Sequence, residues 1–335
     1  MHLLTIETTC DETAAAIVTD RLEVKASVVA SQDDLHRRFG GVVPEIASRA
    51  HMEAIDVVCA DALEQAGLTP AQIDAVAVTN GPGLVGSLLV GVGFAKGFAY
   101  TRGLPFLGVN HLEGHIAAAF LDSEAPTFPF VALVVSGGHS HLYEVVDFFR
   151  MRLLGQTVDD AAGEAFDKAA KLLGLGFPGG PAIDRAAQQG DPAACRLPRP
   201  MLHSDDLAMS FSGLKTAIRR LIEDAGGLAG LSTPDLAASF QAAVVDVLVG
   251  KALAALERTG IPRLVICGGV SANRRLREQA AAACNRRGMA LTVPAPAYCT
   301  DNAAMIAAAG YRRLAAGERS ALTLNGYASL AEAPR

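Results

Sequence analysis

Residues 130–146 read FVALVVSGGHSHLYEVV. Two short apolar runs, 130–135 and 142–146, flank the polar stretch SGGHS at 136–140. Apolar runs of this length around a small polar turn predict a β-hairpin with a polar tip. The start of the chain has the same design, because LLTIETTCDETAAAIV at 3–18 places apolar runs on both sides of the polar TCDE. The recurrence indicates an internal duplication.

A second kind of segment also occurs once in each half. Residues 73–79 are apolar and lead into NGPG at 80–83, and residues 263–267 lead into GGVSAN at 268–273. Each glycine-rich loop is followed by a predicted helix. Further helices are predicted at 44–66, 159–173, 234–258, 271–287 and 302–316. Strands alternating with helices predict an α/β protein with helices on the sheet faces.

The length of 335 residues suggests about two domains. We therefore expect a duplicated two-lobed α/β fold, with an N-terminal lobe at 1–128 and a C-terminal lobe at 129–335. An irregular stretch rich in Gly, Pro and Arg, at about 174–209, is expected to be an active-site insertion in the second lobe.

Composition excludes several classes of protein. With 50% hydrophobic and 19% charged residues, the chain is neither disordered nor a coiled coil. The six cysteines are scattered without a CxxC pair, which fits a reducing, cytoplasmic setting. The uncharged run at 75–95 is long enough to span a membrane. Its five glycines and Pro82 instead predict a strand, a loop and a helix, so we expect no membrane contact.

Charge is distributed unevenly along the chain. Residues 1–130 have a net charge of −9 and residues 131–335 a net charge of +3. A nucleic acid would therefore contact the second half or the surfaces of partner proteins. The arginine groups at 274–277, 286–287 and 312–313 are candidates for phosphate contacts, and solvated helix faces are the simpler interpretation.

His111 and His115 are four residues apart in HLEGH, which places them on one face of a helix. That spacing suits a divalent metal ion, and neutral imidazole suits Zn²⁺ or Fe²⁺. Asp301, at the start of the last long helix, offers a third ligand. Surface or capping histidines are the alternative. Glu113 lies about 200° around the helix from His111, so it is not placed as the general base of a zinc protease.

Three glycine pairs lie in loops, at 137–138, 179–180 and 268–269. Glycine allows backbone N–H groups to approach a phosphate closely. Each pair alone is typical of a tight turn, but three in a duplicated chain indicate a nucleotide site. Asp167 and Asp184 could bind ribose hydroxyls or be solvated helix residues. Asn273 begins a helix, where capping is the favoured interpretation.

Nine longer motifs span almost the whole chain in order. They are IETTCDET (6–13), GGVVPEIASRAH (40–51), GPGLVGSLLVG (81–91), NHLEGH (110–115), VALVVSGGHSHL (131–142), DDAAGEAFDKAAKLLGLGFPGGP (159–181), FSGLKT (211–216), CGGVSANRRLR (267–277) and CTDNAAMIA (299–307). Together they resemble the tRNA N6-adenosine threonylcarbamoyltransferase family (TsaD, formerly called O-sialoglycoprotein endopeptidase or glycoprotease).

The resemblance implies the actin/Hsp70-like ATPase fold, with a nucleotide and metal site between the lobes. It also implies one divalent metal ion per subunit, held by His111, His115 and Asp301, with Fe²⁺ favoured and Zn²⁺ possible. By the same resemblance, the residues of the adenylate and substrate pocket are Val134, Val135, Ser136, Gly137, Gly138, Asp167, Gly180, Asp184 and Asn273.

The implied reaction transfers the threonylcarbamoyl group of threonylcarbamoyl-AMP to N6 of adenosine 37 in tRNAs that read ANN codons, forming t6A and releasing AMP. A metal ion would orient the threonylcarbamoyl group and polarise its carbonyl. Glu12 and His139 are the candidates for a general base. A metalloprotease, or a small-molecule kinase of the same fold, is the alternative function.

The resemblance also implies partner proteins, namely an inactive TsaB-like paralogue and a small TsaE-like ATPase. The predicted helix at 44–66 carries an apolar stripe that could form the pairing surface or pack on its own sheet. The stripe consists of Ile46, Ala50, Ile55, Val58 and Ala62.

Overall fold

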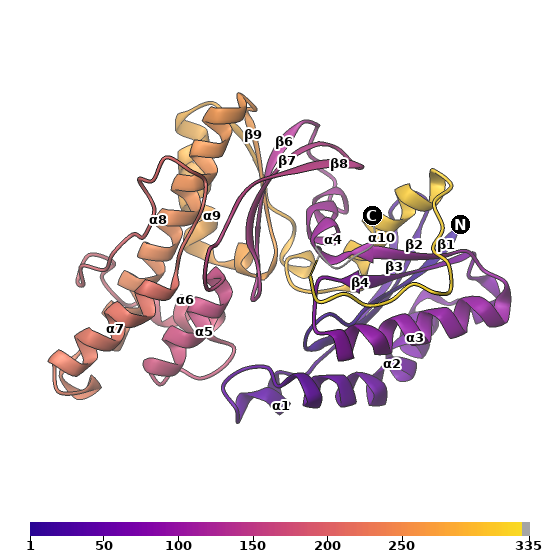
Figure 1. Cartoon of the computed structure of the whole chain (residues 1–335), viewed down its shortest axis with the longest axis horizontal. Helices are drawn as coiled ribbons and strands as arrows, with labels where there is room; N and C mark the ends of the chain where they lie inside the picture. The colour runs from indigo at the N-terminus through magenta and orange to yellow at the C-terminus, as the bar shows by residue number, and fades with distance from the viewer. Residues whose placement is uncertain (330–335) are drawn as a thin grey trace. The chain divides into compact units, whose positions relative to one another are not determined.

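The computed structural model describes residues 1–329 and divides the chain into two compact units (Figure 1). Unit 1 consists of Met1–Ala125 and the segment that begins at Asp301, and unit 2 consists of Pro126–Thr300. The structure therefore differs from the sequence expectation at one point: the segment after Thr300 belongs to unit 1, not to the C-terminal lobe.

Packing of the last helix explains this difference. Helix α10 (Ala303–Ala315) is rich in alanine and glycine, which lets its backbone lie close to the sheet of unit 1. A Cβ atom on Gly310 would lie 3.1 Å from the Cβ of Ala77. Thr5 also donates a hydrogen bond to the carbonyl of Ala303 at 2.7 Å. The helix thus covers a sheet face that residues 1–125 leave open.

Unit 1 is built on a five-stranded sheet of order β3-β2-β1-β4-β5. Its strands are β1 (His2–Glu7), β2 (Glu12–Thr19), β3 (Val24–Ser31), β4 (Ala75–Gly81) and β5 (Phe106–Asn110). Its other helices are α1 (Asp33–Arg37), α2 (Pro44–Ala66), α3 (Val85–Arg102) and α4 (His111–Ala117). Side chains alternate between sheet faces, so Leu4 and Ile6 join the core under α2 and α3, whereas Thr5 faces α10.

Unit 2 contains a second five-stranded sheet, of order β10-β9-β6-β7-β8. Its strands are β6 (Phe130–Val135), β7 (Ser140–Asp147), β8 (Arg150–Gln156), β9 (Arg263–Cys267) and β10 (Ala290–Thr292). Its helices are α5 (Ala162–Leu172), α6 (Gly179–Ala187), α7 (Ser212–Asp224), α8 (Thr233–Thr259) and α9 (Arg274–Arg286). Short 3₁₀ turns of the two units lie at Pro70–Gln72, Ala118–Phe120, Leu228–Gly230, Gly269–Ala272 and Pro296–Tyr298.

The two sheets have the same topology, which confirms the duplication. In each, three strands form an antiparallel meander, β1-β2-β3 and β6-β7-β8. The first strand of each meander then pairs in parallel with a later strand, β4 or β9, and that strand pairs in parallel with β5 or β10. Both hairpins with polar tips lie where the sequence predicts them.

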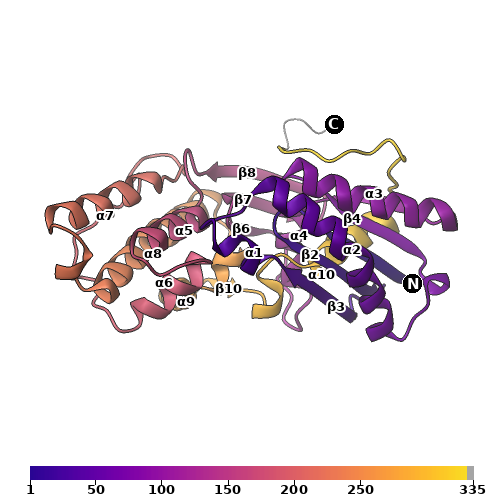
Figure 2. The ribbon, with the colours of Figure 1, turned by 90° about the horizontal axis from the view of Figure 1, so that it is seen from below.

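Helix α8 forms the centre of unit 2. Among the described residues it is the one helix long and apolar enough to cross a membrane, but 83% of its most apolar window is buried inside the protein. It packs against α5, α6, α7 and α9 (Figure 2). Its apolar character is that of a core helix. The run at 75–95 forms β4, a loop and the first part of α3, as predicted.

Candidate metal and nucleotide sites

The histidine pair is positioned by the end of β5. Asn110, the last residue of that strand, caps α4: its Oδ1 accepts hydrogen bonds from the N–H groups of Leu112 (2.8 Å) and Glu113 (3.3 Å). Because α4 begins at His111, both histidines face the same side one turn apart, and both are buried. The helical arrangement predicted from the spacing is confirmed.

Asp301 reaches the two histidines from the residues before α10. Gly114 packs on Ile306, where a Cβ atom would lie 2.7 Å from the Cδ1 of Ile306, so glycine permits close approach of α4 to α10. Asp301 Oδ1 lies 3.1 Å from His115 Nε2 and 3.6 Å from His111 Nε2. One potential ligand atom from each residue lies within 4.8 Å of the others.

The donor set fits a divalent metal ion. Within residues 1–329, neither ring nitrogen of His115 forms a hydrogen bond, although both are buried. Buried polar atoms without partners are uncommon in native proteins. Two imidazoles from α4 and one carboxylate from the residues before α10 form the three-ligand set typical of metal centres that keep a position open for substrate. A cation at this position would be a ligand partner for Nε2 of His115, the nitrogen that lies 3.1 Å from Asp301 Oδ1.

Glu7 orients His111, and the sequence analysis missed this residue. It is fully buried at the end of β1 and accepts hydrogen bonds from the N–H of Thr9 (2.6 Å) and the hydroxyl of Thr79. Nδ1 of His111 lies 3.1 Å from Glu7 Oε2. A carboxylate only accepts, so Nδ1–H donates and Nε2 is directed to Asp301. The available signal was an acidic residue at the end of an apolar strand.

The carboxylates around the histidines perturb the pKa values of both rings. Burial lowers the pKa of His111, but the charges of Asp301 and Glu7 outweigh it and raise the pKa to about 9. Burial and the neighbouring His111 lower the pKa of His115. The carboxylates of Asp301 and Glu7 therefore favour a positive charge beside the two rings.

Glu12, a candidate general base, lies at the start of β2 in the same unit. Burial raises the pKa of its carboxyl well above the usual value, and the charges of Asp301 and Asp11 add to the effect. A carboxylate with a raised pKa is a stronger base than an exposed one. Glu12 and the metal ligands are therefore electrostatically linked.

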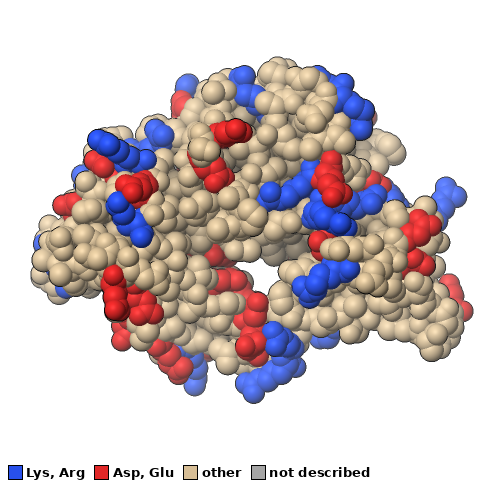
Figure 3. Space-filling view, turned by 180° about the vertical axis from the view of Figure 1, so that it is seen from behind, with Lys and Arg blue, Asp and Glu red and all other residues tan. Residues whose placement is uncertain are grey.

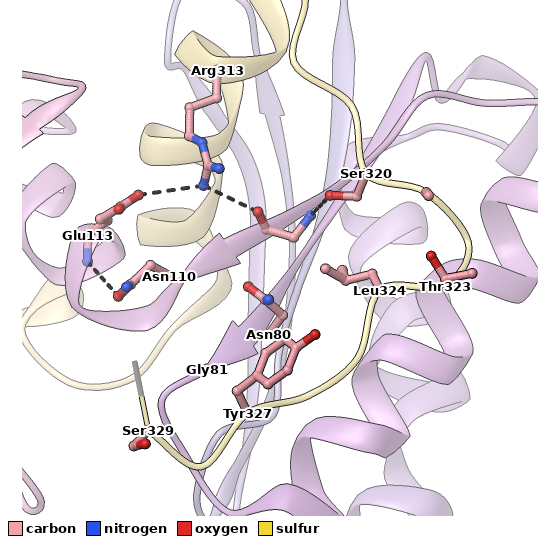
Figure 4. A pocket seen from close by; sticks show the side chains of 12 residues that line it. Asn80, Gly81, Asn110, Glu113, Arg313, Ser320, Thr323, Leu324, Tyr327 and Ser329 are labelled. Carbon is pink, nitrogen blue, oxygen red and sulfur yellow. Dashed lines mark hydrogen bonds and ion pairs between the residues drawn. The ribbon is translucent and has the colours of Figure 1, made fainter. Parts of the chain in front are cut away.

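Glu113 faces away from the histidine pair, as predicted. It lines a cavity of about 470 Å³ between α4 and the segment after α10 (Figure 4). Its carboxylate forms an ion pair with Arg313 at 3.5 Å. The cavity is also lined by Asn80 and Tyr327, and its residues all belong to unit 1. The glutamate is thus a structural ion-pair partner, not the base of a protease.

In unit 2 the predicted phosphate loop follows β6 directly. Val134 and Val135 are buried in the strand, and Gly137 and Gly138 are exposed at the tip. The carbonyls of Ser136 and Gly137 accept hydrogen bonds from the first amides of α5, each at 3.2 Å. Within the described part of the chain, the N–H groups of Gly137 and Gly138 donate to no protein acceptor. Two amide donors are therefore free for a ligand.

The loop after β9 lies next to the same strand. Gly268 has a φ of +89°, and a Cβ atom there would lie 2.4 Å from the carbonyl oxygen of Val135, so only glycine fits. The next turn ends at Asn273, whose Oδ1 accepts from the N–H of Leu276 at 3.0 Å and caps α9. The capping interpretation is confirmed. The amide nitrogen of Asn273 is the part of the side chain still available to donate.

The remaining pocket residues come from α5 and α6. Asp167 Oδ1 accepts from the N–H of Gly179 at 2.7 Å, and Asp184 Oδ1 accepts from Gln241 Nε2 at 2.6 Å. No atom lies within 4 Å of a Cβ built on Gly180, so the surrounding protein does not require glycine there. Both aspartates therefore have a structural role through one oxygen.

His139, the second candidate base, lies in the β6–β7 turn. Its carbonyl accepts from the N–H of Ser136 at 2.8 Å, and its ring lies edge-on to that of His141 at 5.3 Å. His111, His115 and Asp301, which we call the metal set, therefore lie in unit 1. The predicted adenylate residues and His139 lie in unit 2.

Comparisons with known proteins show which family the chain belongs to. The family described as "TsaD: tRNA N6-adenosine threonylcarbamoyltransferase" matches residues 23–308. The chain is 52% identical over 318 residues to the tRNA N6-adenosine threonylcarbamoyltransferase of Desulforapulum autotrophicum, covering 95% of this chain and 96% of the relative. It is 55% identical to the enzyme of the same name from Anaeromyxobacter dehalogenans strain 2CP-C, covering 97% of each chain.

Solved structures show the fold. HypF of T. kodakarensis superposes with a TM-score of 0.63 at 11% identity, covering 94% of this chain and 48% of HypF. Component A of the Acidaminococcus fermentans (R)-2-hydroxyglutaryl-CoA dehydratase superposes with a TM-score of 0.56 at 14% identity, covering 94% and 99%. These neighbours share the actin/Hsp70-like ATPase fold that the family resemblance implies. With a family match over most of its length and relatives more than half identical along nearly all of it, the chain belongs to the TsaD family, whose members transfer a threonylcarbamoyl group to N6 of adenosine in tRNA.

Proposed function

We propose that the donor is threonylcarbamoyl-AMP, bound in unit 2, and that the acceptor is adenosine 37 of tRNAs that read ANN codons. The free amides of Gly137 and Gly138 are the observation that carries the donor site, because backbone N–H groups on a glycine loop are suited to a phosphate. Val134, Val135 and Ser136 form the strand end that positions this loop.

The other pocket residues have complementary chemistry toward an adenylate. The carboxylates of Asp167 and Asp184 have the chemistry to accept hydrogen bonds from ribose hydroxyls. The amide nitrogen of Asn273 can donate to an oxygen of the ligand, and Gly180 leaves space for its approach. The mixed anhydride of the donor has a good leaving group, so no protein nucleophile is required. Binding and alignment of the two substrates are the main contributions of the protein.

We propose His111, His115 and Asp301 as the ligands of one divalent metal ion per subunit, with Fe²⁺ favoured and Zn²⁺ possible. When bound, the ion supplies orientation of the threonylcarbamoyl group and polarisation of its carbonyl. Glu12 and His139 are the proposed groups for accepting the proton from N6, and Glu12 is favoured because its pKa is raised.

Two substitutions test the adenylate site without removing its structural hydrogen bonds. Asn in place of Asp184 still accepts from Gln241, and Asp in place of Asn273 is still a good helix cap. We expect Asp184→Asn and Asn273→Asp each to weaken AMP binding about tenfold or more in calorimetry. Asp184→Asn replaces an acceptor oxygen proposed to face the ligand with an NH₂ donor, and Asn273→Asp replaces the proposed NH₂ donor with an acceptor oxygen. Melting temperature and metal content should stay near the wild-type values.

Mass analysis of tRNA nucleosides tests the reaction itself. With metal-loaded protein, threonylcarbamoyl-AMP, tRNA and any required companion proteins, we expect t6A and one AMP per modified nucleoside. Asp184→Asn should lower t6A yield at limiting donor. Unchanged AMP affinity in both variants would assign Asp184 and Asn273 purely structural roles. Peptide cleavage or sugar phosphorylation without t6A would favour the protease or the kinase.

We further propose a cytoplasmic enzyme that works with a TsaB-like paralogue and a TsaE-like ATPase. Ile55, Val58 and Ala62 of the predicted stripe lie in the core of unit 1, which agrees with the alternative that the stripe packs on its own sheet. The apolar side chains that α2 and α3 expose are instead Met52, Val57, Val85, Leu89 and Tyr100. We place the TsaB-like partner on this surface, which we call the α2–α3 face.

A further inference from the structure

Two of the arginines that the sequence singles out, Arg277 and Arg313, are committed to contacts within the protein. Arg277 donates to the carbonyls of Ser271 (2.7 Å) and Pro294 (2.9 Å). Arg313 lies in unit 1 and forms an ion pair with Glu318. These arginines hold loops and helices together, so contacts to tRNA phosphates are to be sought among other cations.

Unit 2 is the more basic part of the chain. Residues 126–300 contain 18 Lys and Arg against 16 Asp and Glu, a net charge of +2, whereas unit 1 has a net charge of −8. Figure 3 shows groups of basic side chains on the right of that view, around α9. A different basic group, which the sequence analysis did not single out, lies along α7.

Helices α5 and α7 pack together (Figure 2), and a groove of about 520 Å³ runs along α7 beside them. We call it the α7 groove. Its charged lining residues are four basic and two acidic: Lys168, Lys215, Arg219, Arg220, Asp160 and Glu223. The hydroxyls of Ser212 and Thr216 also line it. The groove is therefore positively charged and rich in hydrogen-bond donors.

Two of the four cations are engaged with carboxylates. Lys168 pairs with Asp160 at 2.7 Å, and Arg219 pairs with Glu223 at 2.8 Å. Among the described residues, Lys215 and Arg220 have no carboxylate within 4 Å. The positive charges of Lys215 and Arg220 are therefore not neutralised by a neighbouring carboxylate of residues 1–329 and can bind an external anion.

The positive charge has no evident structural purpose. Lys215 and Arg219 are four residues apart on one face of α7, a like-charge spacing that destabilises a helix. The amides at the start of α7 are already capped, because Asp159 accepts from the N–H groups of Phe211 (2.8 Å) and Ser212 (3.4 Å). The groove is thus a set of side-chain cations, distinct from a helix-terminus anion site.

We propose that the α7 groove binds the phosphodiester backbone of the tRNA substrate, with Lys215 and Arg220 contacting phosphates. Their Cα atoms are about 7.5 Å apart along the helix axis, which spreads the charge along a strand of phosphates instead of concentrating it on one. Arginine and lysine side chains and Ser or Thr hydroxyls are the usual donors to nucleic-acid phosphates. The inference rests on the tRNA substrate of the family.

The double variant Lys215→Ala/Arg220→Ala tests the proposal. Both side chains are at least partly exposed and alanine favours helix, so the variant should fold. The matched control, Arg185→Ala/Arg258→Ala, removes two exposed cations of unit 2 that do not line the groove. Binding of unmodified tRNA to the intact chain is measured by fluorescence anisotropy at several salt concentrations, and AMP binding by calorimetry.

We expect the groove variant to bind tRNA about tenfold more weakly. We also expect its salt dependence, the slope of log K against log salt, to be shallower by about 1.5. AMP affinity should be unchanged, and the control should bind tRNA as the wild type does. Wild-type affinity and slope in the groove variant, an equal loss in the control, or a loss confined to AMP would each overturn the proposal. Because AMP binding is read separately, this failure is distinguishable from failure of the adenylate site.

Discussion

At the scale of single residues, Glu7 determines which nitrogen of His111 faces Asp301. Its carboxylate accepts from Nδ1–H and has its other bonds from Thr9 and Thr79, so it cannot rotate away without losing them. A carboxylate behind a histidine ligand fixes the tautomer and increases the basicity of the ligating nitrogen. Glu7 is therefore a positioning residue for the proposed metal ligand.

Glu7→Gln should lower metal affinity about 10- to 100-fold, because an amide can present its NH₂ group to Nδ1 and favour the wrong tautomer. Competition titration with a chelator measures the affinity directly. Thr13→Val is the control, since it removes the buried contact of Thr13 with His51 (2.8 Å), a histidine outside the metal set. Equal metal affinity in Glu7→Gln and the wild type would remove Glu7 from the site.

At the scale of secondary-structure elements, α5 and the phosphate loop are held in contact by a glycine. A Cβ atom on Gly163 would lie 2.6 Å from the carbonyl oxygen of Ser136 and 2.8 Å from the Cα of Gly137. Both are backbone atoms, which cannot move aside as a side chain can. The closeness of this helix start to the loop is what leaves the amides of Gly137 and Gly138 facing outward.

Gly163→Ala should therefore destabilise the protein by about 1–3 kcal/mol from overpacking, a cost larger than the helix-propensity gain of about 1 kcal/mol. It should also weaken AMP binding by displacing the loop. Gly180→Ala is the informative comparison, because the new Cβ would meet no protein atom within 4 Å. The Gly180→Ala variant should keep the thermal stability of the wild type. Its AMP affinity should fall only because the new methyl group contacts the ligand. Thermal melts and calorimetry on both proteins distinguish steric from ligand effects; a stable Gly163→Ala would contradict the packing argument.

Hydrophobic patterns in the sequence predicted helices and strands. Features that depend on close tertiary packing could not be predicted in this way. The polar-tipped hairpins and α2 were located from hydrophobic runs and from Pro44 and Gly67 at the helix ends. The third meander strands β3 and β8 were missed because about half of the side chains of each are exposed, so neither strand is a continuous apolar run. The position of Asp301 in unit 1 was missed because the packing of α10 depends on close contacts, such as Gly310 with Ala77, that carry no sequence period.

The placement of His111 and His115 on one helix face was predictable from their spacing, whereas the carboxylate that orients His111 was not. Glu7 and His111 are 104 residues apart, and nothing local connects them. Asp184 could be named as a candidate, but its bond to Gln241, 57 residues away, appears only when the helices are packed. Sequence patterns identify groups with the right chemistry, and the tertiary structure assigns each group its partners.

At the scale of the whole molecule, the α2–α3 face is the apolar surface proposed for pairing. A Cβ on Gly86 would lie 2.4 Å from Ser48 Oγ, so the two helices are in close contact. Met52 lies one turn after Ser48 on α2, and Leu89 lies about one turn after Gly86 on α3. Both side chains are exposed. Exposed apolar side chains on adjacent helices are characteristic of protein interfaces.

Leu89→Glu should weaken pairing with the TsaB-like partner about tenfold or more, because a charge would be buried at the interface. Leu153→Glu is a matched control: Leu89 and Leu153 are both 47% exposed, and Leu153 lies on β8 of unit 2. Size-exclusion chromatography with circular dichroism reads pairing and folding separately. Normal pairing by a folded Leu89→Glu would place the partner elsewhere.

The division of unit 1 into two stretches of chain has a consequence for biosynthesis. A ribosome that has completed Ala125 must still add the 175 residues of Pro126–Thr300 before Asp301 emerges, which takes roughly 10–35 s at bacterial elongation rates. During that interval the nascent first sheet has neither α10 on its open face nor Asp301, the third proposed metal ligand, while the inserted unit has its complete sequence and can fold. A cation at the proposed site could therefore be held by all three ligands only after translation has passed Asp301.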